Sequence, residues 1–120
     1  MSSIAAGLSV ANHALYCASK CANEGLCRSF AADGGPRRIT CNCIAPGGIK
    51  TDMFEQNAWH YAPGGTPDTP ISQIEAGIAK LVPLGRVAIP ADIAKVVMFL
   101  CHEDSEWVNG MWYNVFGEVR

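Results

Sequence analysis

The sequence lacks the features that would assign it to a membrane, secreted or nucleic-acid-binding class. It has no apolar run of the roughly 18 residues that a membrane span needs and no basic cluster longer than Arg37-Arg38. Its N-terminus has neither the basic nor the apolar segment of a secretory signal. Charged residues make up only 17% and the net charge is −2, which is too little charge for a disordered chain. We expect a small globular, cytoplasmic protein with no membrane or nucleic-acid partner.

Metal-binding cysteine motifs are also missing. The chain has six cysteines but no Cys-x-x-Cys pair, so no zinc site of the usual kind is indicated. Cys17 and Cys21 lie four apart in a helical pattern, and Cys41 and Cys43 lie two apart in a strand-like pattern. We therefore expect buried or half-buried free thiols and no metal site. A thiol or metal protein is the weakest of the functional alternatives.

Helical and extended patterns alternate along the chain. Apolar residues recur at helical spacing over residues 13–32 and again from Pro90 onward. Residues 38–45 are apolar or β-branched at nearly every position, which is typical of a strand covered on both faces, and residues 110–116 form a second short strand pattern. This alternation predicts an α/β fold with right-handed parallel crossovers.

Residues 49–86 have a weak pattern that is rich in glycine, proline and polar residues. A segment of this length inside a small domain is usually a lid or binding loop, and we expect one short helix within it, at residues 72–80. The Pro46-Gly47-Gly48 turn comes just before the lid and ends the predicted strand. The carboxyl end of a parallel strand is where open α/β sheets bind ligands, so a site is expected there.

Three residues suggest a proton-transfer site. Tyr16 and Lys20 lie four apart, so they share one face of the predicted helix, and Ser3 precedes Tyr16 by thirteen positions. A free tyrosine hydroxyl, with a reference pKa of about 10, is poorly matched to proton transfer at neutral pH. A nearby ammonium group favours the charged form of a phenol. Together with a serine hydroxyl that holds a substrate oxygen, such a pair can protonate a ketone oxygen as hydride reaches the carbon.

The sequence resembles the short-chain dehydrogenase/reductase family along nearly its whole length. The matching motifs occur in the family's order and spacing: Ser2-Ser3-Ile4, Tyr16-Cys17-Ala18-Ser19-Lys20, Ile39 to Thr51, Pro83-Leu84-Gly85-Arg86, Pro90-Ala91-Asp92-Ile93-Ala94 and Trp107-Val108-Asn109-Gly110. The stretches 12–16 and 46–53 are most similar to the fungal polyhydroxynaphthalene and versicolorin reductases. The resemblance implies a Rossmann-like, doubly wound parallel sheet, of which this chain would be the C-terminal half.

The resemblance also implies roles for individual residues. Ser3 would orient the substrate carbonyl, Tyr16 would be the general acid/base, and Lys20 would assist Tyr16 and bind the nicotinamide ribose. Backbone groups of Ile49 would meet the nicotinamide carboxamide, and Thr51 would hydrogen-bond the cofactor. The implied cofactor is NADP, with NAD as the alternative, and the implied substrate is a small ketone or alcohol.

Within the polyhydroxynaphthalene branch, an aromatic ring of the lid stacks on a flat substrate. The matching position is Tyr61, with Trp59 and Phe54 as alternatives, and Met53 would line the same substrate site. The alternative is that these residues have no role in binding and simply pack within the lid. His13 and His60 are interpreted as hydrogen-bonded or solvent-facing residues rather than as ligands or bases.

The chain departs from the family in what it does not contain. No glycine-rich phosphate-binding turn is present, and residues 112–120 drift from the family's closing Asp-Gly-Gly turn. We therefore expect residues 1–120 to be one partial, catalytic-half domain with an uncovered sheet edge, marginal stability and homo-oligomeric association. Two functions follow: an oxidoreductase that acts on a cyclic or aromatic polyketide ketone, or an inactive fragment that associates with full-length relatives.

Overall fold

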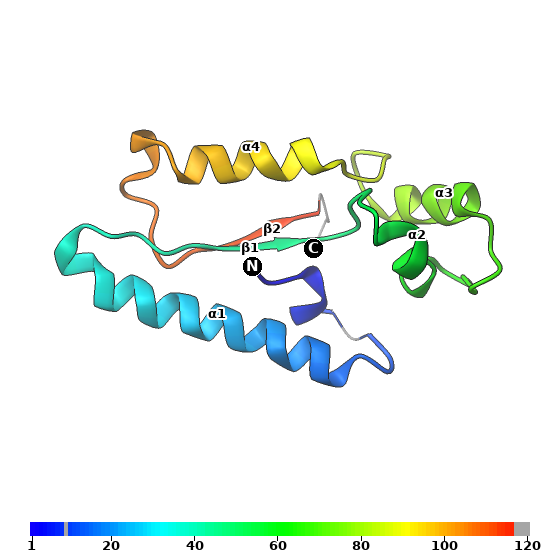
Figure 1. The fold of residues 1–120 in the computed structure, drawn as a ribbon, viewed down its shortest axis with the longest axis horizontal. Helices are drawn as coiled ribbons and strands as arrows, with labels where there is room; N and C mark the ends of the chain where they lie inside the picture. Colours follow the sequence, from blue (N-terminus) through cyan, green and yellow to red (C-terminus); the bar gives the residue numbers. More distant parts are fainter. Residues whose placement is uncertain (9, 117–120) are drawn as a thin grey trace.

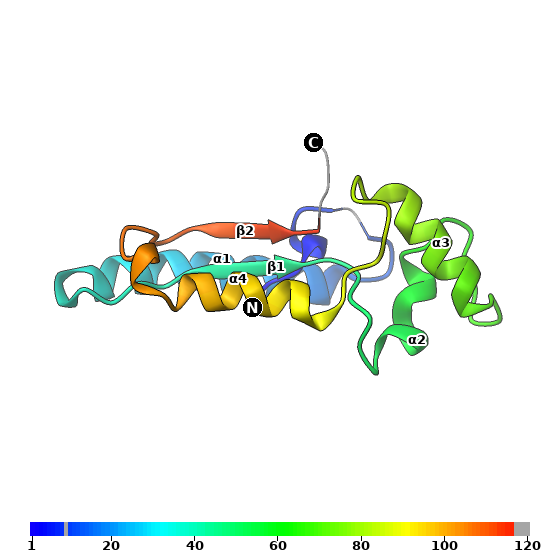
Figure 2. The same cartoon turned by 90° about the horizontal axis from the view of Figure 1, so that it is seen from above.

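Three layers make up the central part of the fold. Helix α1 (Ala14–Gly34) and helix α4 (Pro90–Leu100) cover opposite faces of a two-stranded sheet (Figures 1 and 2). Strand β1 (Cys43–Pro46) pairs in parallel with β2 (Trp112–Val115). The computed structural model describes residues 1–8 and 10–116, so part of the divergent tail, residues 117–120, lies outside the described residues. The predicted parallel α/β architecture is confirmed.

Strand β1 is shorter than the 38–45 segment that the sequence pattern predicts. The short 3-10 helix η2 (Gly35–Arg37) follows α1, and Arg38 then adopts a left-handed backbone with φ of 59°. Residues Cys41 and Asn42 lie outside the strand and are held by other groups. The Cys41 N–H donates to the side chain of Asn109, and the Asn42 side chain donates to the Val108 carbonyl, at 2.8 Å each.

The second edge of β1 carries the N-terminal segment. The Ser2 N–H donates to the Ile44 carbonyl at 2.7 Å, on the side of β1 away from β2. The chain then turns into the 3-10 helix η1 (Ile4–Ala6) and passes on to the start of α1 (Figure 1). The N-terminal residues therefore reach the carboxyl end of β1 from the neighbouring strand position.

The lid is a packed helical unit rather than a loosely ordered loop. It contains α2 (Phe54–Asn57), the 3-10 helix η3 (Ala58–His60) and α3 (Ile71–Leu81), which is the helix predicted at residues 72–80. Its buried side chains form the main hydrophobic cluster of the described chain: Phe54, Ala58, Ile74, Ile78, Val82 and Val87. The sequence pattern did not reveal this cluster, because its members are spread over α2, η3, α3 and the residues that follow α3.

Both ends of the lid are tied together beside the sheet. Ile49 and Ala88 form an isolated parallel bridge, in which the Lys50 N–H donates to the Ala88 carbonyl at 2.9 Å and the Ala88 N–H donates to the Gly48 carbonyl at 3.3 Å. An ion pair of 2.5 Å joins Lys50 to Glu75 on α3. The first and last residues of the lid therefore lie side by side, beyond the carboxyl ends of the strands (Figure 1).

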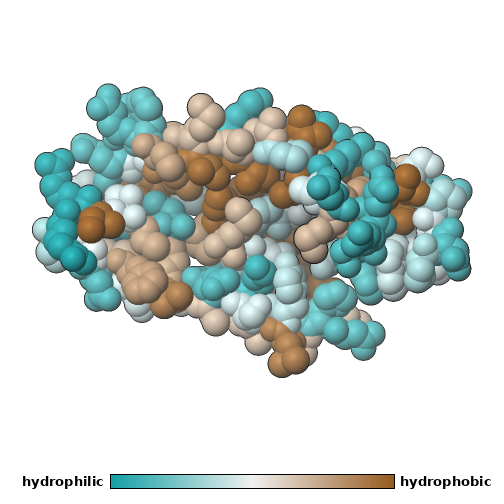
Figure 3. All heavy atoms as spheres, in the orientation of Figure 1, coloured by the Kyte–Doolittle hydropathy of each residue, from teal (hydrophilic) through white to brown (hydrophobic). Residues whose placement is uncertain are grey.

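Several apolar faces are open to solvent. The apolar residues that recur every four positions on α1 do not face the sheet: Leu26 and Phe30 are about half exposed, and α1 buries Cys27 and Ala31 instead. On the opposite layer, apolar surface extends over α4 and the strands (Figure 3), where Met98, Phe99 and Met111 are exposed.

The cysteines only partly follow the expectation of buried or half-buried thiols. All six are free, but Cys21 and Cys101 are exposed, so the expectation is wrong for these two. No helix in the described part of the chain is long and apolar enough to cross a membrane.

Candidate functional site

A cavity of about 560 Å³ opens at the carboxyl end of β1. Its walls come from the N-terminal segment, the first turns of α1, the Pro46–Thr51 turn and the lid. All of the residues predicted to act in catalysis, cofactor binding or substrate binding line it: Ser3, Tyr16, Lys20, Ile49, Thr51, Met53 and Tyr61. Two separate stretches of the chain, residues 3–20 and 49–61, thus bring these seven residues to one hollow.

Ser3 is held at the cavity because its neighbour Ser2 is anchored to α1. The side chain of Ser2 is buried, and its hydroxyl lies 3.0 Å from the Lys20 carbonyl oxygen and 2.9 Å from Oε1 of Glu24. Ser3 is half-buried and extended, and its Oγ accepts a hydrogen bond from the Ala5 N–H at 3.2 Å. Because that bond uses an oxygen lone pair, the hydroxyl proton of Ser3 is free to be donated to another group.

Tyr16 and Lys20 share the face of α1 that borders the cavity, as their spacing predicts. The Lys20 Nζ lies over the Tyr16 ring, 5.3 Å from its centroid, which is within the range of a cation–π contact. Tyr16 is about two-fifths exposed and Lys20 is half-buried. The ammonium group therefore stays beside the phenol without being sequestered from solvent.

The turn after β1 presents backbone groups to the cavity. The bridge to Ala88 uses the Gly48 carbonyl and the Lys50 N–H, so the backbone groups of Ile49 point away from Ala88. The Ile49 carbonyl accepts the Thr51 N–H at 2.8 Å. Close packing fixes the turn, because a side chain at Gly47 would overlap the ring of Phe116.

An aromatic cluster joins α1 to the lid across the cavity rim. The ring centroid of His13 lies 6.4 Å from that of Tyr16, 5.9 Å from that of Tyr61 and 5.1 Å from that of His60. Trp59 stacks on His60 at 3.6 Å. Met53 stands at the entrance to the lid and is largely exposed.

Sequence reasoning missed the place of the two histidines. His13 is hydrogen-bonded, as expected, with its Nδ1 2.7 Å from the Ala11 carbonyl oxygen, but both His13 and His60 also line the cavity. Nothing in the local spacing signals this, because 47 positions separate the two residues and only the folded lid brings them together. Among the described residues, no group of three metal-binding side chains occurs.

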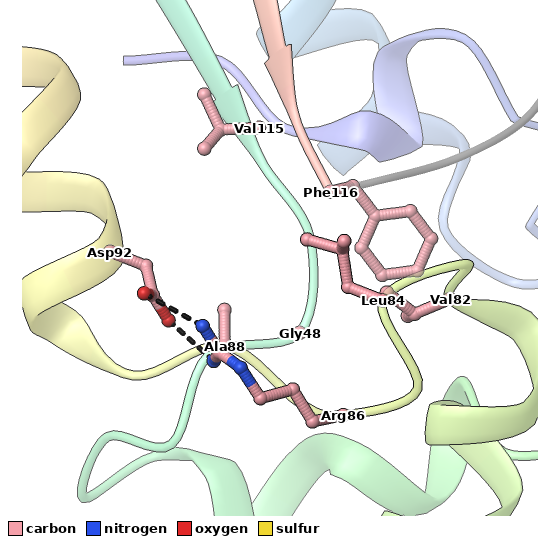
Figure 4. Close-up of a pocket in the computed structure, with 8 residues that line it drawn as sticks. All are labelled: Gly48, Val82, Leu84, Arg86, Ala88, Asp92, Val115 and Phe116. Carbon is pink, nitrogen blue, oxygen red and sulfur yellow. Dashed lines mark hydrogen bonds and ion pairs between the residues drawn. The ribbon is translucent and has the colours of Figure 1, made fainter.

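A smaller hollow of about 120 Å³ lies between the lid hinge and α4 (Figure 4). Its charged members are Arg86 and Asp92, whose side chains form two hydrogen bonds of 2.6 and 2.9 Å with each other. These bonds, with one from the Ile89 N–H, hold the pKa of Asp92 well below its usual range. Because the two charges satisfy each other and cap the first turn of α4, this hollow offers no free charge to a ligand.

Comparison with known proteins places the whole described chain in one family. The profile of the family described as enoyl-(acyl carrier protein) reductase matches residues 1–116. A hydroxynaphthalene reductase-like protein Arp2 from Metarhizium brunneum (strain ARSEF 3297) is 61% identical over 111 residues, which are 92% of this chain and 42% of the relative. The tetrahydroxynaphthalene reductase PfmaG from Pestalotiopsis fici is 56% identical over 91% of this chain and 40% of its own length.

Solved structures agree with this placement. Levodione reductase superimposes with a TM-score of 0.84 at 31% identity, over 97% of this chain and 43% of that protein. A 7α-hydroxysteroid dehydrogenase, complexed with NADH and 7-oxo glycochenodeoxycholic acid, gives a TM-score of 0.82 at 34% identity, over 98% and 41%. The chain thus spans about two-fifths of the length of the proteins that it matches.

The geometry predicts an unusual titration for Tyr61. Burial in the rim, together with the proximity of Tyr16 and Cys17, raises the pKa of the Tyr61 hydroxyl. NMR titration of the ring resonances is expected to show Tyr61 ionising above the pH at which free tyrosine does. In a Tyr16→Phe variant the Tyr61 pKa should fall slightly but stay raised, since burial remains. A Tyr61 pKa at or below that of free tyrosine would contradict the described rim.

Proposed function

Because the chain belongs to the short-chain dehydrogenase/reductase family, we propose that it forms the catalytic end of an oxidoreductase. The reaction is reduction of a cyclic or aromatic polyketide ketone through Ser3, Tyr16 and Lys20. The observation that carries the proposal is the convergence of the seven residues that the family resemblance implies on one cavity of about 560 Å³. That volume is in the range of pockets that hold small organic ligands.

Ser3, Tyr16 and Lys20 have different roles in the protonation of a ketone oxygen. Ser3 donates its free hydroxyl proton to the carbonyl oxygen and fixes its position. Tyr16 transfers its phenolic proton to the same oxygen as negative charge develops there. Lys20, whose ammonium lies over the ring of Tyr16, stabilises the negative charge that the transfer leaves on the phenol. Solvent then restores the Tyr16 proton through the open side of the cavity.

The residues present fit the nicotinamide end of a dinucleotide cofactor. Lys20 and Thr51 border the same cavity, and the backbone of Ile49 points away from its bridge partner. Lys20 would bind the ribose, backbone groups of Ile49 would meet the carboxamide, and Thr51 would hydrogen-bond the cofactor. When bound, the cofactor supplies the hydride. We propose NADP, with NAD as the alternative.

The rim supports a flat, aromatic substrate. Tyr61, His13 and His60 present rings around the opening, and Met53 adds a flexible apolar side chain. Offset stacking and edge contacts of such rings favour planar aromatic ligands. By name, the relatives reduce hydroxynaphthalenes, and a bicyclic polyketide ketone of that kind is the substrate class that we propose.

Replacing Tyr16 with phenylalanine tests the proposal directly. The variant keeps the ring but loses the acid, so NADPH oxidation with a naphthol-type ketone should fall by about 10²- to 10⁴-fold. Tyr113→Phe on β2, outside the cavity residues, is the matched control and should retain the rate. Equal rates in the Tyr16→Phe variant and the unmodified chain, including no rate in either, would contradict the assignment.

A second candidate function is association with copies of itself or with full-length relatives. The observation that favours it is the exposed apolar stripe of α1, where Leu15 is 89% exposed and Leu26 and Phe30 are each just over half exposed. These residues lie on one side of the helix by their spacing. An uncovered stripe of this kind is typical of a subunit interface.

Charge placed on that stripe should weaken association. Leu26→Glu is expected to raise the dissociation constant of self-association by about tenfold or more, measured by sedimentation velocity and native mass spectrometry. Arg28→Gln, an exposed change on another side of α1, is the control and should leave the constant unchanged. A monomeric unmodified chain that forms no mixed oligomer with an intact relative would contradict this function.

A further inference from the structure

Three of the six cysteines form a cluster that the proposed reaction does not use. Cys27 lies about two turns before the end of α1, Cys41 lies just before β1, and Cys43 is the first residue of β1. Residues two apart on an extended segment point the same way, which places Cys41 and Cys43 on the side of α1. The Sγ atoms of Cys41 and Cys27 are 3.7 Å apart. We propose that Cys27 and Cys41 are an oxidisable dithiol that closes to a disulfide cross-link between α1 and the entry to β1.

Asn109 holds the two chain segments in place for this contact. Its side-chain oxygen accepts the Cys41 N–H at 2.8 Å, and its side-chain nitrogen donates to the carbonyl of Ala31, one turn beyond Cys27, at 3.1 Å. The Gly110 N–H also donates to the Cys41 carbonyl at 2.9 Å. The sulfur contact therefore rests on a hydrogen-bonded backbone, and disulfide formation requires the two Sγ atoms to close from 3.7 Å to about 2.05 Å.

The two thiols differ in burial, and this difference determines which of them the oxidant reaches first. Cys27 is buried, and this burial, strengthened by the neighbouring Cys41 and Cys43, raises its pKa to about 11. Cys41 is only partly buried, so an oxidant meets Cys41 first. Cys27 stays protonated near neutral pH, and its closeness to Cys41 offsets its small thiolate fraction in the second step.

With a peroxide as the oxidant, the reaction balances in two steps. The Cys41 thiol loses its proton and the thiolate attacks one peroxide oxygen, so the O–O bond breaks and a sulfenic acid forms on Cys41. The hydroxide that leaves takes up the proton that Cys41 lost and becomes one molecule of water. The Cys27 sulfur then attacks the Cys41 sulfur, the S–O bond breaks, and the departing hydroxide takes the Cys27 proton as a second water. The two thiols lose two electrons and two protons, and the peroxide is reduced. The other peroxide-reactive candidates, exposed Cys21 and Cys101, have no sulfur partner among the described residues.

Peptide mapping of the oxidised chain tests the proposal. Brief treatment of the folded chain with hydrogen peroxide, followed by mass spectrometry, is expected to show a Cys27–Cys41 cross-linked peptide and two fewer titratable thiols. The cross-link closes a loop of about 15 residues and should raise the Tm by about 5 °C or more, and a reducing agent should reverse both changes.

Variants separate this pair from its neighbours. Cys27→Ala and Cys41→Ser should each abolish the cross-link and the Tm gain, and Cys41→Ser, the less buried change, serves if the first variant does not fold. Cys101→Ser should leave both intact. Cross-links through Cys43, disulfides only between chains, or oxidation confined to Cys21 and Cys101 would each overturn the proposal. None of these measurements depends on enzyme activity, so failure of the proposed function would leave this test unaffected.

Discussion

The anchoring of Ser2 between β1 and α1 is the constraint on which the arrangement of the site depends. Its backbone N–H bonds the Ile44 carbonyl, and its buried hydroxyl lies within hydrogen-bond distance of the Lys20 carbonyl. One residue thus ties the segment that carries Ser3 to the strand whose end opens the cavity and to the helix that carries Tyr16 and Lys20. A buried hydroxyl without these partners would cost about 1–3 kcal/mol, so the segment is held in one place. The side-chain amide of Asn23, which donates to the Met1 carbonyl at 3.2 Å, reinforces the attachment.

A second constraint is the closure of the lid. The bridge between Ile49 and Ala88 returns the chain to the sheet after the lid, so the lid's own hydrophobic cluster is placed over the carboxyl ends of the strands. From there Tyr61 and His60 meet His13 at the start of α1. The chemistry proposed for the site follows from this placement: the polar donors come from the N-terminal segment and α1, and the lid brings the rings of His60 and Tyr61 to meet them.

Much of this arrangement could be predicted from local pattern. The Tyr16–Lys20 spacing, the helical repeat of α1 and the turn after β1 depend on neighbours in sequence, and those predictions agree with the structure. The features that were missed depend on distant partners. The predicted strand begins later than expected, because Arg38 takes a left-handed backbone and the Cys41 N–H bonds the side chain of Asn109, 68 positions away. The exposed stripe of α1 was recognised as apolar, but its pattern alone does not say which neighbour covers it. His13, His60 and the Cys27–Cys41 contact likewise exist only once the chain has folded.

The proposed site requires that α1 and the lid enclose one cavity. A nuclear Overhauser experiment on the chain, with histidine and tyrosine rings selectively labelled, measures this most directly. Cross-peaks from the His13 ring to the rings of Tyr16, His60 and Tyr61 are expected, because the ring centroids lie 5.1 to 6.4 Å apart. Cross-peaks to Tyr16 alone would show that the lid rings do not border the same hollow as α1, and would contradict the account.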